Sequence, residues 1–155
     1  MQSHRKPRPP GRRRQKGSSL LEVLIAVLVM AIGMLGIAAL QAVTLKNSNS
    51  SAGRSQAVIH IYSAFDTLRL NRAVALAGGY NVPDFVCETK EAEDGDDTDY
   101  TVFNGWLAGV QADLGPASCG RINCADEVCT IGVQWDDSRA VGGGAEESFN
   151  MQSRL

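Results

Sequence analysis

The feature that most constrains this chain is an uncharged apolar run from Val23 to Leu40, with one carboxylate, Glu22, immediately before it. As an α-helix rising about 1.5 Å per residue, these eighteen residues cover roughly 27 Å, close to the hydrocarbon thickness of a bilayer. The run is apolar on every side, as a membrane span or a buried helix should be. We therefore expect a membrane-spanning helix here.

A strongly basic leader precedes this run. Its seven Lys and Arg residues lie within the first 16 positions: Arg5, Lys6, Arg8, Arg12, Arg13, Arg14 and Lys16. Positive charge before an apolar helix favours cytoplasmic retention of that end, over a nuclear or RNA-binding tract. A generic secretory signal is the nearest alternative, but it has a shorter apolar core followed by an A-x-A-like site, which is not evident here. We expect Met1–Lys16 to be a disordered cytoplasmic leader.

Glu22 needs a partner if it lies against a membrane. A carboxylate costs about 2.5 to 3.5 kcal/mol at the centre of a membrane helix, and less near its end. A cut after Gly17 would turn Ser18 into a free cationic amine four residues from Glu22. Because four residues make about one helical turn, the amine could face this carboxylate within one chain or across a neighbour. A carboxylate in the first turn also suits the helix dipole.

The segment Gly17-Ser18-Ser19-Leu20-Leu21-Glu22 resembles the prepilin processing site of type IV pilins and pseudopilins. The resemblance implies that a prepilin peptidase cuts between Gly17 and Ser18 and methylates the new N-terminus at Ser18. It also implies that Glu22 guides assembly, and that the fold is α+β and pilin-like: a long N-terminal helix packed on a small antiparallel sheet. The chain departs from the family at Ser18, where Phe is usual.

The charge that remains after such a cut argues against nucleic-acid binding. All the leader charges leave with residues 1–17. The remaining chain has eight Lys and Arg against 17 Asp and Glu, a formal net charge of −9. A domain this acidic does not suit electrostatic capture of DNA or RNA.

Catalytic patterns are missing from the sequence. His60 is the only histidine beyond the leader, and we expect it to be solvated or half-buried and hydrogen-bonded. There is no supported Ser-His-Asp set, no H-E-x-x-H and no phosphate-binding glycine loop. We expect no enzyme activity, no cofactor and no metal. The acidic segment Glu91–Asp99 invites a calcium hypothesis, but the EF-hand pattern would need an acid at Lys90, so a solvated loop is the better interpretation.

Four cysteines, Cys87, Cys119, Cys124 and Cys129, follow the apolar run, and an even number in a small exported domain favours two disulfides. Their spacing matches no common zinc pattern. Strands at Cys119–Cys124 and Val128–Trp135, joined by the turn-like residues 125–128, predict a hairpin. This hairpin favours Cys124 with Cys129 and Cys87 with Cys119, while Cys119 with Cys129 stays an alternative.

The remaining chain predicts the other elements. One long helix is expected from Ser19 to about Ala77, with a bend or a break in the polar stretch Lys46–Gly53. Its second half carries an apolar stripe that should pack on the domain core: Ala57, Val58, Ile61, Ala64, Phe65 and Leu68. Gly78-Gly79 should end it. A loop is expected at 80–100, a helix at 103–114 with Asn104 as N-cap, and a last strand at 149–155.

These patterns divide the chain into a leader (1–17), a membrane and assembly half of the helix (18–41) and an amphipathic half (42–79). An exported disulfide-containing region (80–155) would form one head domain with 54–79.

Four blocks are further similar to the PilV type of minor pilin, the type IV pilus modification proteins: residues 32–41, the end of the long helix with Asn71 and Arg72, residues 106–115 and residues 133–137. This resemblance implies a structural protein that helps prime pilus assembly, with roles in twitching motility and adhesion. It would be a single-pass inner-membrane protein with a cytoplasmic N-terminus and a periplasmic C-terminal domain, and would later join the pilus at the cell surface.

The implied partners are prepilin peptidase, other minor and major pilins, and the inner-membrane assembly platform. A type II secretion pseudopilin, a tip adhesin or other binding module, and an exported enzyme on a signal anchor are the alternatives.

Overall fold

The computed structural model describes residues 17, 19–91 and 98–155. The expectations for the leader 1–16, for methylation at Ser18 and for most of the acidic segment fall outside the described residues. The chain divides into two compact units, residues 1–40 and residues 41–155, which are described separately.

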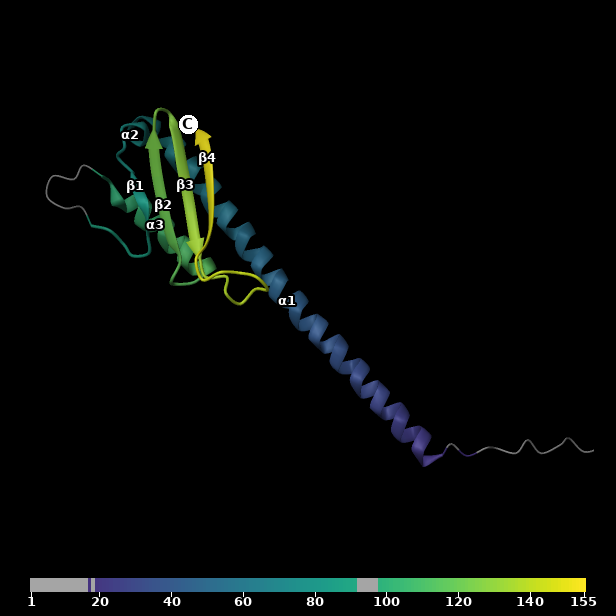
Figure 1. Ribbon diagram of the computed structural model, residues 1–155. Coiled ribbons are helices and arrows are strands. Elements are labelled where there is room, and N and C mark those ends of the chain that lie inside the picture. Colours follow the sequence, from purple (N-terminus) through teal and green to yellow (C-terminus); the bar gives the residue numbers. More distant parts are fainter. Residues whose placement is uncertain (1–16, 18, 92–97) are drawn as a thin grey trace, which may run out of the picture. The chain divides into compact units, whose positions relative to one another are not determined.

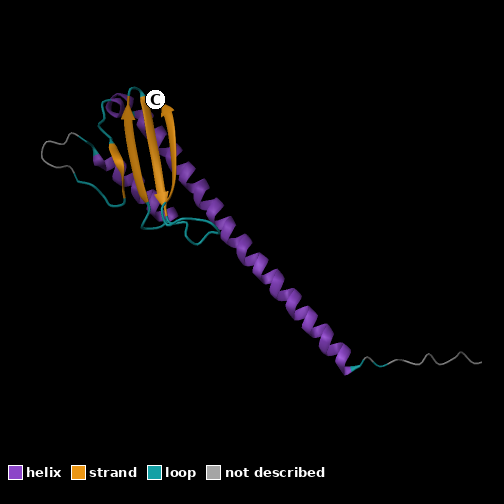
Figure 2. Cartoon of the chain, viewed as in Figure 1, coloured by secondary structure: helices purple, strands orange, loops and turns teal. Residues whose placement is uncertain are grey.

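The described residues form three helices and four strands, labelled in Figure 1 and coloured by type in Figure 2. In chain order they are α1 (Leu20–Leu70), α2 (Arg72–Leu76), β1 (Val82–Val86), α3 (Tyr100–Leu114), β2 (Cys119–Ala125), β3 (Val128–Trp135) and β4 (Glu147–Arg154).

Helix α1 is continuous through the polar stretch Lys46–Gly53, so the expected break is absent. One serine hydroxyl in this stretch bonds within the helix: Ser51 Oγ donates to the carbonyl of Asn47 at 3.0 Å, and just beyond the stretch Ser55 Oγ donates to the carbonyl of Ser51 at 2.9 Å. A methyl group on Gly53 would lie in ordinary contact with Trp135, 3.5 Å from its Nε1, so this part of α1 lies beside the end of β3. The predicted single helix to Ala77 is interrupted at Asn71, and Gly78, with φ of +86°, follows α2.

The four strands form one antiparallel sheet in the order β1-β2-β3-β4. The β2–β3 hairpin pairs Cys119 with Gln134 at one end and Ala125 with Val128 at the other. Its turn is therefore the two residues Asp126 and Glu127, shorter than predicted. Both have positive φ, 50° and 68°, as a type I′ turn requires.

Two boundaries in the first part of the head were predicted wrongly. Residues Val82–Val86, expected to be loop, form the edge strand β1, whose pairing with β2 is irregular. Helix α3 begins three residues before the predicted start because Asp99, not Asn104, is its N-cap and accepts a bond from the N–H of Thr101 at 2.9 Å. The side-chain amide of Asn104 instead bonds the backbone of Lys90: its Oδ1 accepts from the N–H, and its Nδ2 donates to the carbonyl.

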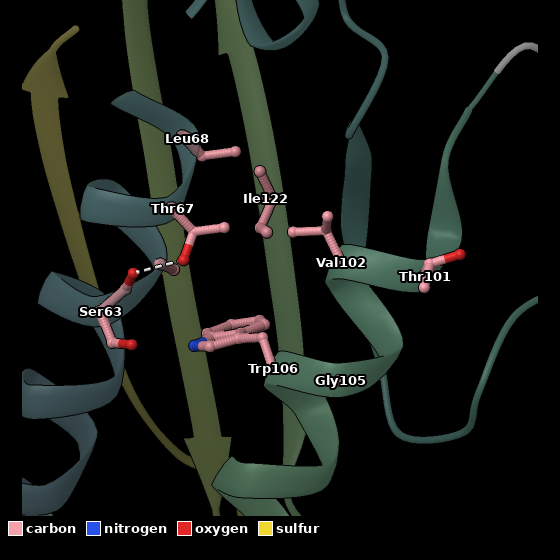
Figure 3. Close-up of a pocket in the computed structure, with 9 residues that line it drawn as sticks. Ser63, Thr67, Leu68, Thr101, Val102, Gly105, Trp106 and Ile122 are labelled. Atoms are coloured by element: carbon pink, nitrogen blue, oxygen red, sulfur yellow. Dashed lines mark hydrogen bonds between the residues drawn. The ribbon is translucent and has the colours of Figure 1, made fainter. Parts of the chain in front are cut away.

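Helices α1 and α3 pack on the same face of the sheet, and the core lies between them and the strands (Figure 3). The predicted stripe is largely confirmed, since all its members except the half-buried Val58 are buried. Its main partners are apolar residues of α3 and the sheet: Phe103, Leu107, Val110, Ile122, Ile131, Val133 and Trp135. The expected pilin-like α+β architecture, a long N-terminal helix packed on a small antiparallel sheet, is thereby confirmed.

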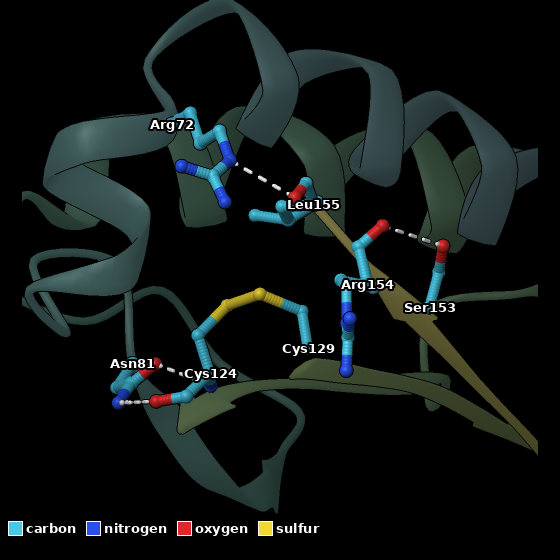
Figure 4. The surroundings of a disulfide bond; sticks show 7 residues. All are labelled: Arg72, Asn81, Cys124, Cys129, Ser153, Arg154 and Leu155. Carbon is cyan, nitrogen blue, oxygen red and sulfur yellow. Dashed lines mark hydrogen bonds between the residues drawn. A yellow bond between two sulfur atoms is a disulfide. The ribbon is translucent and has the colours of Figure 1, made fainter. Parts of the chain in front are cut away.

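Two disulfides close the head, Cys87–Cys119 and Cys124–Cys129, the pairs that the hairpin favours. Figure 4 shows the second pair, which joins residues directly opposite each other in β2 and β3. Beside it, the side-chain amide of Asn81 makes two hydrogen bonds to the backbone of Cys124. Its Nδ2 donates to the carbonyl at 3.1 Å, and its Oδ1 accepts from the N–H at 2.8 Å. Together these bonds tie the loop after α2 to the hairpin.

Candidate processing and assembly segment

The start of α1 is defined by Ser19, the residue before its first helical position. Ser19 Oγ accepts a hydrogen bond from the N–H of Glu22 at 3.2 Å. The Ser19 carbonyl accepts from the N–H of Glu22 at 3.0 Å and from that of Val23 at 3.3 Å. Ser19 is therefore the N-cap of α1. Sequence reasoning did not assign it this role, although Ser-x-x-Glu before an apolar run is the signature of a capping box.

Glu22 lies in the first turn of α1 and is exposed in the single chain. At this position its carboxylate interacts favourably with the positive end of the helix dipole. Gly17 is also exposed and lies outside the helix. The predicted cleavage bond joins Gly17 to Ser18, whose own geometry lies outside the described residues.

The apolar part of α1 is uncovered in the isolated chain. Its most apolar 18-residue window has a mean hydropathy of 2.9, and none of it is buried. Large apolar side chains are exposed on every side of this segment, for example Leu20 at 84 %, Leu35 at 72 % and Leu40 at 70 %. By length and composition this helix can cross a membrane. An uncovered surface of this kind has to be buried by lipid or by other helices.

His60 has a structural place in the head. Its Nε2 lies 2.9 Å from Oδ2 of Asp113, and its backbone carbonyl accepts a bond from Nε1 of Trp106 at 2.9 Å. These two contacts brace α1 against α3, as expected of a half-buried, hydrogen-bonded histidine. Within the described ranges no three His, Cys, Asp or Glu side chains are grouped so that they could hold a metal ion.

A groove of about 240 Å³ opens between α1, α3 and β2 (Figure 3). Trp106, Val102 and Ile122 form its apolar wall, and Ser63 and Thr67 of α1 lie opposite. Thr67 Oγ1 donates to the carbonyl of Ser63 at 3.0 Å, so this hydroxyl is engaged within the helix. None of the nine residues that line the groove carries a charge, which leaves it without an acid or a base.

The loop after β3 is fixed to α1 by Asp137, which is only 8 % exposed and accepts a bond from Ser50 Oγ. Next to it, hydrogen bonds from the side chain and the backbone N–H of Ser138 lower the pKa of Asp136. Asp136 is fully exposed, so this lowered pKa belongs to a local turn and not to a buried catalytic acid.

Comparison with protein-family models finds one match: residues 12–38 fit the prokaryotic N-terminal methylation motif. The match covers Gly17, Ser18, Ser19 and Glu22 and most of the apolar run. No curated protein matches the chain. No solved structure matches it either. Residues 12–38 thus carry the prepilin-type N-terminus of type IV pilins and pseudopilins, which implies processing by prepilin peptidase and assembly with pilins.

Proposed function

We propose that this protein is a minor pilin of the PilV type, a non-catalytic subunit that helps to prime assembly of the type IV pilus. The observation that carries the proposal is the prepilin-type N-terminus over residues 12–38. The pilin-like α+β fold supports it, as does the exposed apolar helix, which is consistent with anchoring in the inner membrane before assembly. The proposed orientation has a cytoplasmic N-terminus and a periplasmic head.

The chemistry of the proposed assembly step follows from charge pairing. The cut between Gly17 and Ser18 would create a cationic amine at Ser18, which the same peptidase would methylate. In the growing pilus, the carboxylate of Glu22 would pair with the amine of a neighbouring subunit. In a lipid-like environment such a pair is favoured strongly over two separate charges, so it would set the register between neighbouring helices.

The first test is intact mass and N-terminal sequencing of the membrane-extracted protein, with and without a prepilin peptidase. The expected product begins at Ser18, appears only with the peptidase, and carries one added methyl group. A cut beyond Leu40 would instead indicate a secretory signal and would remove the main support for this function.

The second test separates processing from assembly. Glu22→Ala should still be cut but should fail to enter pili, since the carboxylate is needed only after cleavage. Gly17→Val, the matched control, should remain uncut because the small residue at the cleavage site is lost. Normal pilus incorporation of Glu22→Ala would contradict the assembly role.

A type II secretion pseudopilin is the second candidate, because the N-terminal motif is common to pilins and pseudopilins. A deletion strain distinguishes the two: loss of piliation and twitching supports the minor pilin, whereas loss of secretion with normal twitching supports the pseudopilin.

A further inference from the structure

The two edges of the sheet differ in how they are protected (Figure 1). At one edge, β1 is short, contains Pro83, pairs irregularly with β2 and is tied to it by the Cys87–Cys119 disulfide. At the other edge, β4 pairs with β3 residue by residue from Glu147 to Arg154 and contains neither Pro nor Lys. Bulges, prolines and lysines are devices that keep an edge strand from pairing with another chain. Because β4 lacks them, its outer edge is open to a further strand.

The register of the sheet shows which backbone groups of β4 point outward. Asn81 bonds both the N–H and the carbonyl of Cys124, so these groups point away from β3. Cys124 and its partner Cys129 are therefore a pair without mutual backbone bonds, and the backbone groups of Cys129 point toward β4. Because this direction alternates along a strand, every second residue of β4, from Glu147 to Ser153, bonds β3.

The other residues of β4 direct their N–H and carbonyl groups outward. They are Ser148, Asn150 and Gln152. All three are exposed, and β3 is the only strand beside β4 in the described sheet. The bond from the N–H of Leu155 to the carbonyl of Glu127 agrees with this register, since Leu155 continues the inward series. The outward series is a row of donors and acceptors to which an extended peptide can bind.

Apolar side chains border this edge on the helix side of the sheet, the face on which α1 and α3 pack. Phe149 and Met151 lie on this side because they pair with the core residues Val133 and Ile131. Phe149 is 38 % exposed, and Met151 is partly buried. An added strand would therefore bury apolar surface here.

Two arginines lie where β4 ends. Arg69 of α1 donates to Oγ of Ser153 at 3.4 Å. Arg72 of α2 donates to the carbonyl of Leu155 at 2.9 Å (Figure 4). Each also contacts one carboxylate of the head, but their side chains remain 48 % and 49 % exposed and keep donors for a further acceptor. This corner favours a partner that carries a carboxylate.

We propose that the outer edge of β4, over residues 148–152, docks an extended segment of a partner protein, which joins the sheet as an additional antiparallel strand. The segment carries apolar side chains opposite Phe149 and Met151. Opposite Ser153 it carries a carboxylate that pairs with Arg69. Main-chain hydrogen bonds supply the affinity, and the alternate side chains supply the specificity. This docking site goes beyond the proposed function, because it requires neither processing nor a particular kind of pilus.

The probe is the acetylated peptide Thr-Glu-Thr-Val-Thr-Val-Thr, labelled with a fluorophore at its C-terminus and titrated with the full-length protein in detergent. When it is aligned antiparallel to β4, its valines lie opposite Met151 and Phe149, and its glutamate lies opposite Ser153. We expect saturable binding below about 1 mM, measured by fluorescence anisotropy.

Two changes test whether the backbone edge is the site. Gln152→Pro removes an outward N–H and leaves the bonds of β4 to β3, so it should weaken binding about ten-fold. Gln152→Thr, the matched control, keeps this N–H and should bind like the wild type. In the peptide, methylating the backbone nitrogens of the two inner threonines should abolish binding, since their N–H groups face β4, whereas methylating those of the two valines should be tolerated. The methylated peptides keep the test decisive even if Gln152→Pro does not fold.

Charge pairing is tested with a peptide that has glutamine in place of the glutamate. It should bind the wild-type protein about two- to five-fold more weakly than the glutamate peptide. The two peptides should bind Arg69→Gln equally, and a preference that survives this change would overturn the pairing.

Three outcomes would overturn the docking site: no saturable binding of the peptide, unchanged affinity of a folded Gln152→Pro, or equal binding of the two methylated peptides. A dimer of the wild-type protein that is lost in Gln152→Pro would show that a second copy occupies the edge, and would overturn the partner segment. Weakening by Gln152→Pro and by threonine methylation alone supports the proposal. None of these results depends on cleavage by the prepilin peptidase, so failure here and failure of the proposed function are distinguishable.

Discussion

A tight contact between β2 and α3 predicts the effect of one methyl group. Gly120 lies under the ring of Trp106, and a Cβ atom at this position would overlap Cζ3 of the ring and lie 2.9 Å from Cη2. The ring has little freedom to retreat, because its Nε1 donates to the carbonyl of His60 at 2.9 Å and it contacts Phe103 with the ring centroids 5.9 Å apart. Gly120→Ala should therefore displace Trp106.

The magnitude follows from three contributions. Forcing an extra methyl group against a packed side chain costs about 1 to 3 kcal/mol. Weakening the bond from Trp106 to His60 costs about 0.5 to 1.5 kcal/mol. Replacing a glycine in a strand interior returns about 0.5 to 1 kcal/mol through the lower entropy of the unfolded chain. We expect Gly120→Ala to reduce the free energy of unfolding by about 2 kcal/mol.

The assay is urea unfolding of the full-length protein in a non-denaturing detergent, followed by the intrinsic fluorescence of its two tryptophans, Trp106 and Trp135. Gly105→Ala is the matched control: Gly105 is in α3, and a Cβ there would meet nothing within 4 Å, so the variant should be stabilised by about 0.5 to 1 kcal/mol. In a Trp106→Leu background Gly120→Ala should lose most of its cost. An equal cost in both backgrounds would refute the argument, because the ring would not be the obstacle.

Three further changes test other contacts in the head by the same unfolding measurement. Asp99→Ala removes the cap of α3 and should cost about 1 kcal/mol, and no change would show that the cap is dispensable. Asn81→Ala removes both bonds to the backbone of Cys124 and should cost about 1 to 3 kcal/mol, and a change below 0.5 kcal/mol, roughly the lower limit for one bond, would contradict this. Arg54→Ala breaks the ion pair with Glu147, whose side chains are 60 % and 31 % exposed, and should cost less than about 1 kcal/mol; a larger loss would mean that the pair is not solvent-screened.

The long-range patterns of the sequence were sufficient for most of the head. In α1, apolar residues at helical spacing identify the face that is buried, from Ala57 to Leu68. In β3, alternation predicts a strand with the same bounds as the observed one, Val128–Trp135. These signals are reliable because each repeats over several residues and has only one arrangement that buries every apolar side chain.

The errors occur where a few tertiary contacts outweigh a weak local pattern. Strand β1 is short, contains Pro83 and pairs irregularly, so its residues do not alternate like a half-buried strand. The disulfide between Cys87 and Cys119 ties the end of this strand to β2, but the favoured pairing alone does not show that the residues before Cys87 form a strand. The role of Gly120 is equally hidden, because it depends on the position of Trp106, which belongs to another element.

The environment of α1 changes along its length, and this change links the fold to the proposed function. Around Leu35 apolar side chains are exposed on every side, whereas around Phe65 they are buried on one face only. A helix that served only the head would need the second pattern throughout. The apolar side chains around Leu35 are not buried by any described part of this chain, so they require lipid or neighbouring helices to cover them. A pilin moves between these two surroundings, and the capped N-terminus at Ser19 and the carboxylate at Glu22 lie at the end of the helix where that transfer would begin.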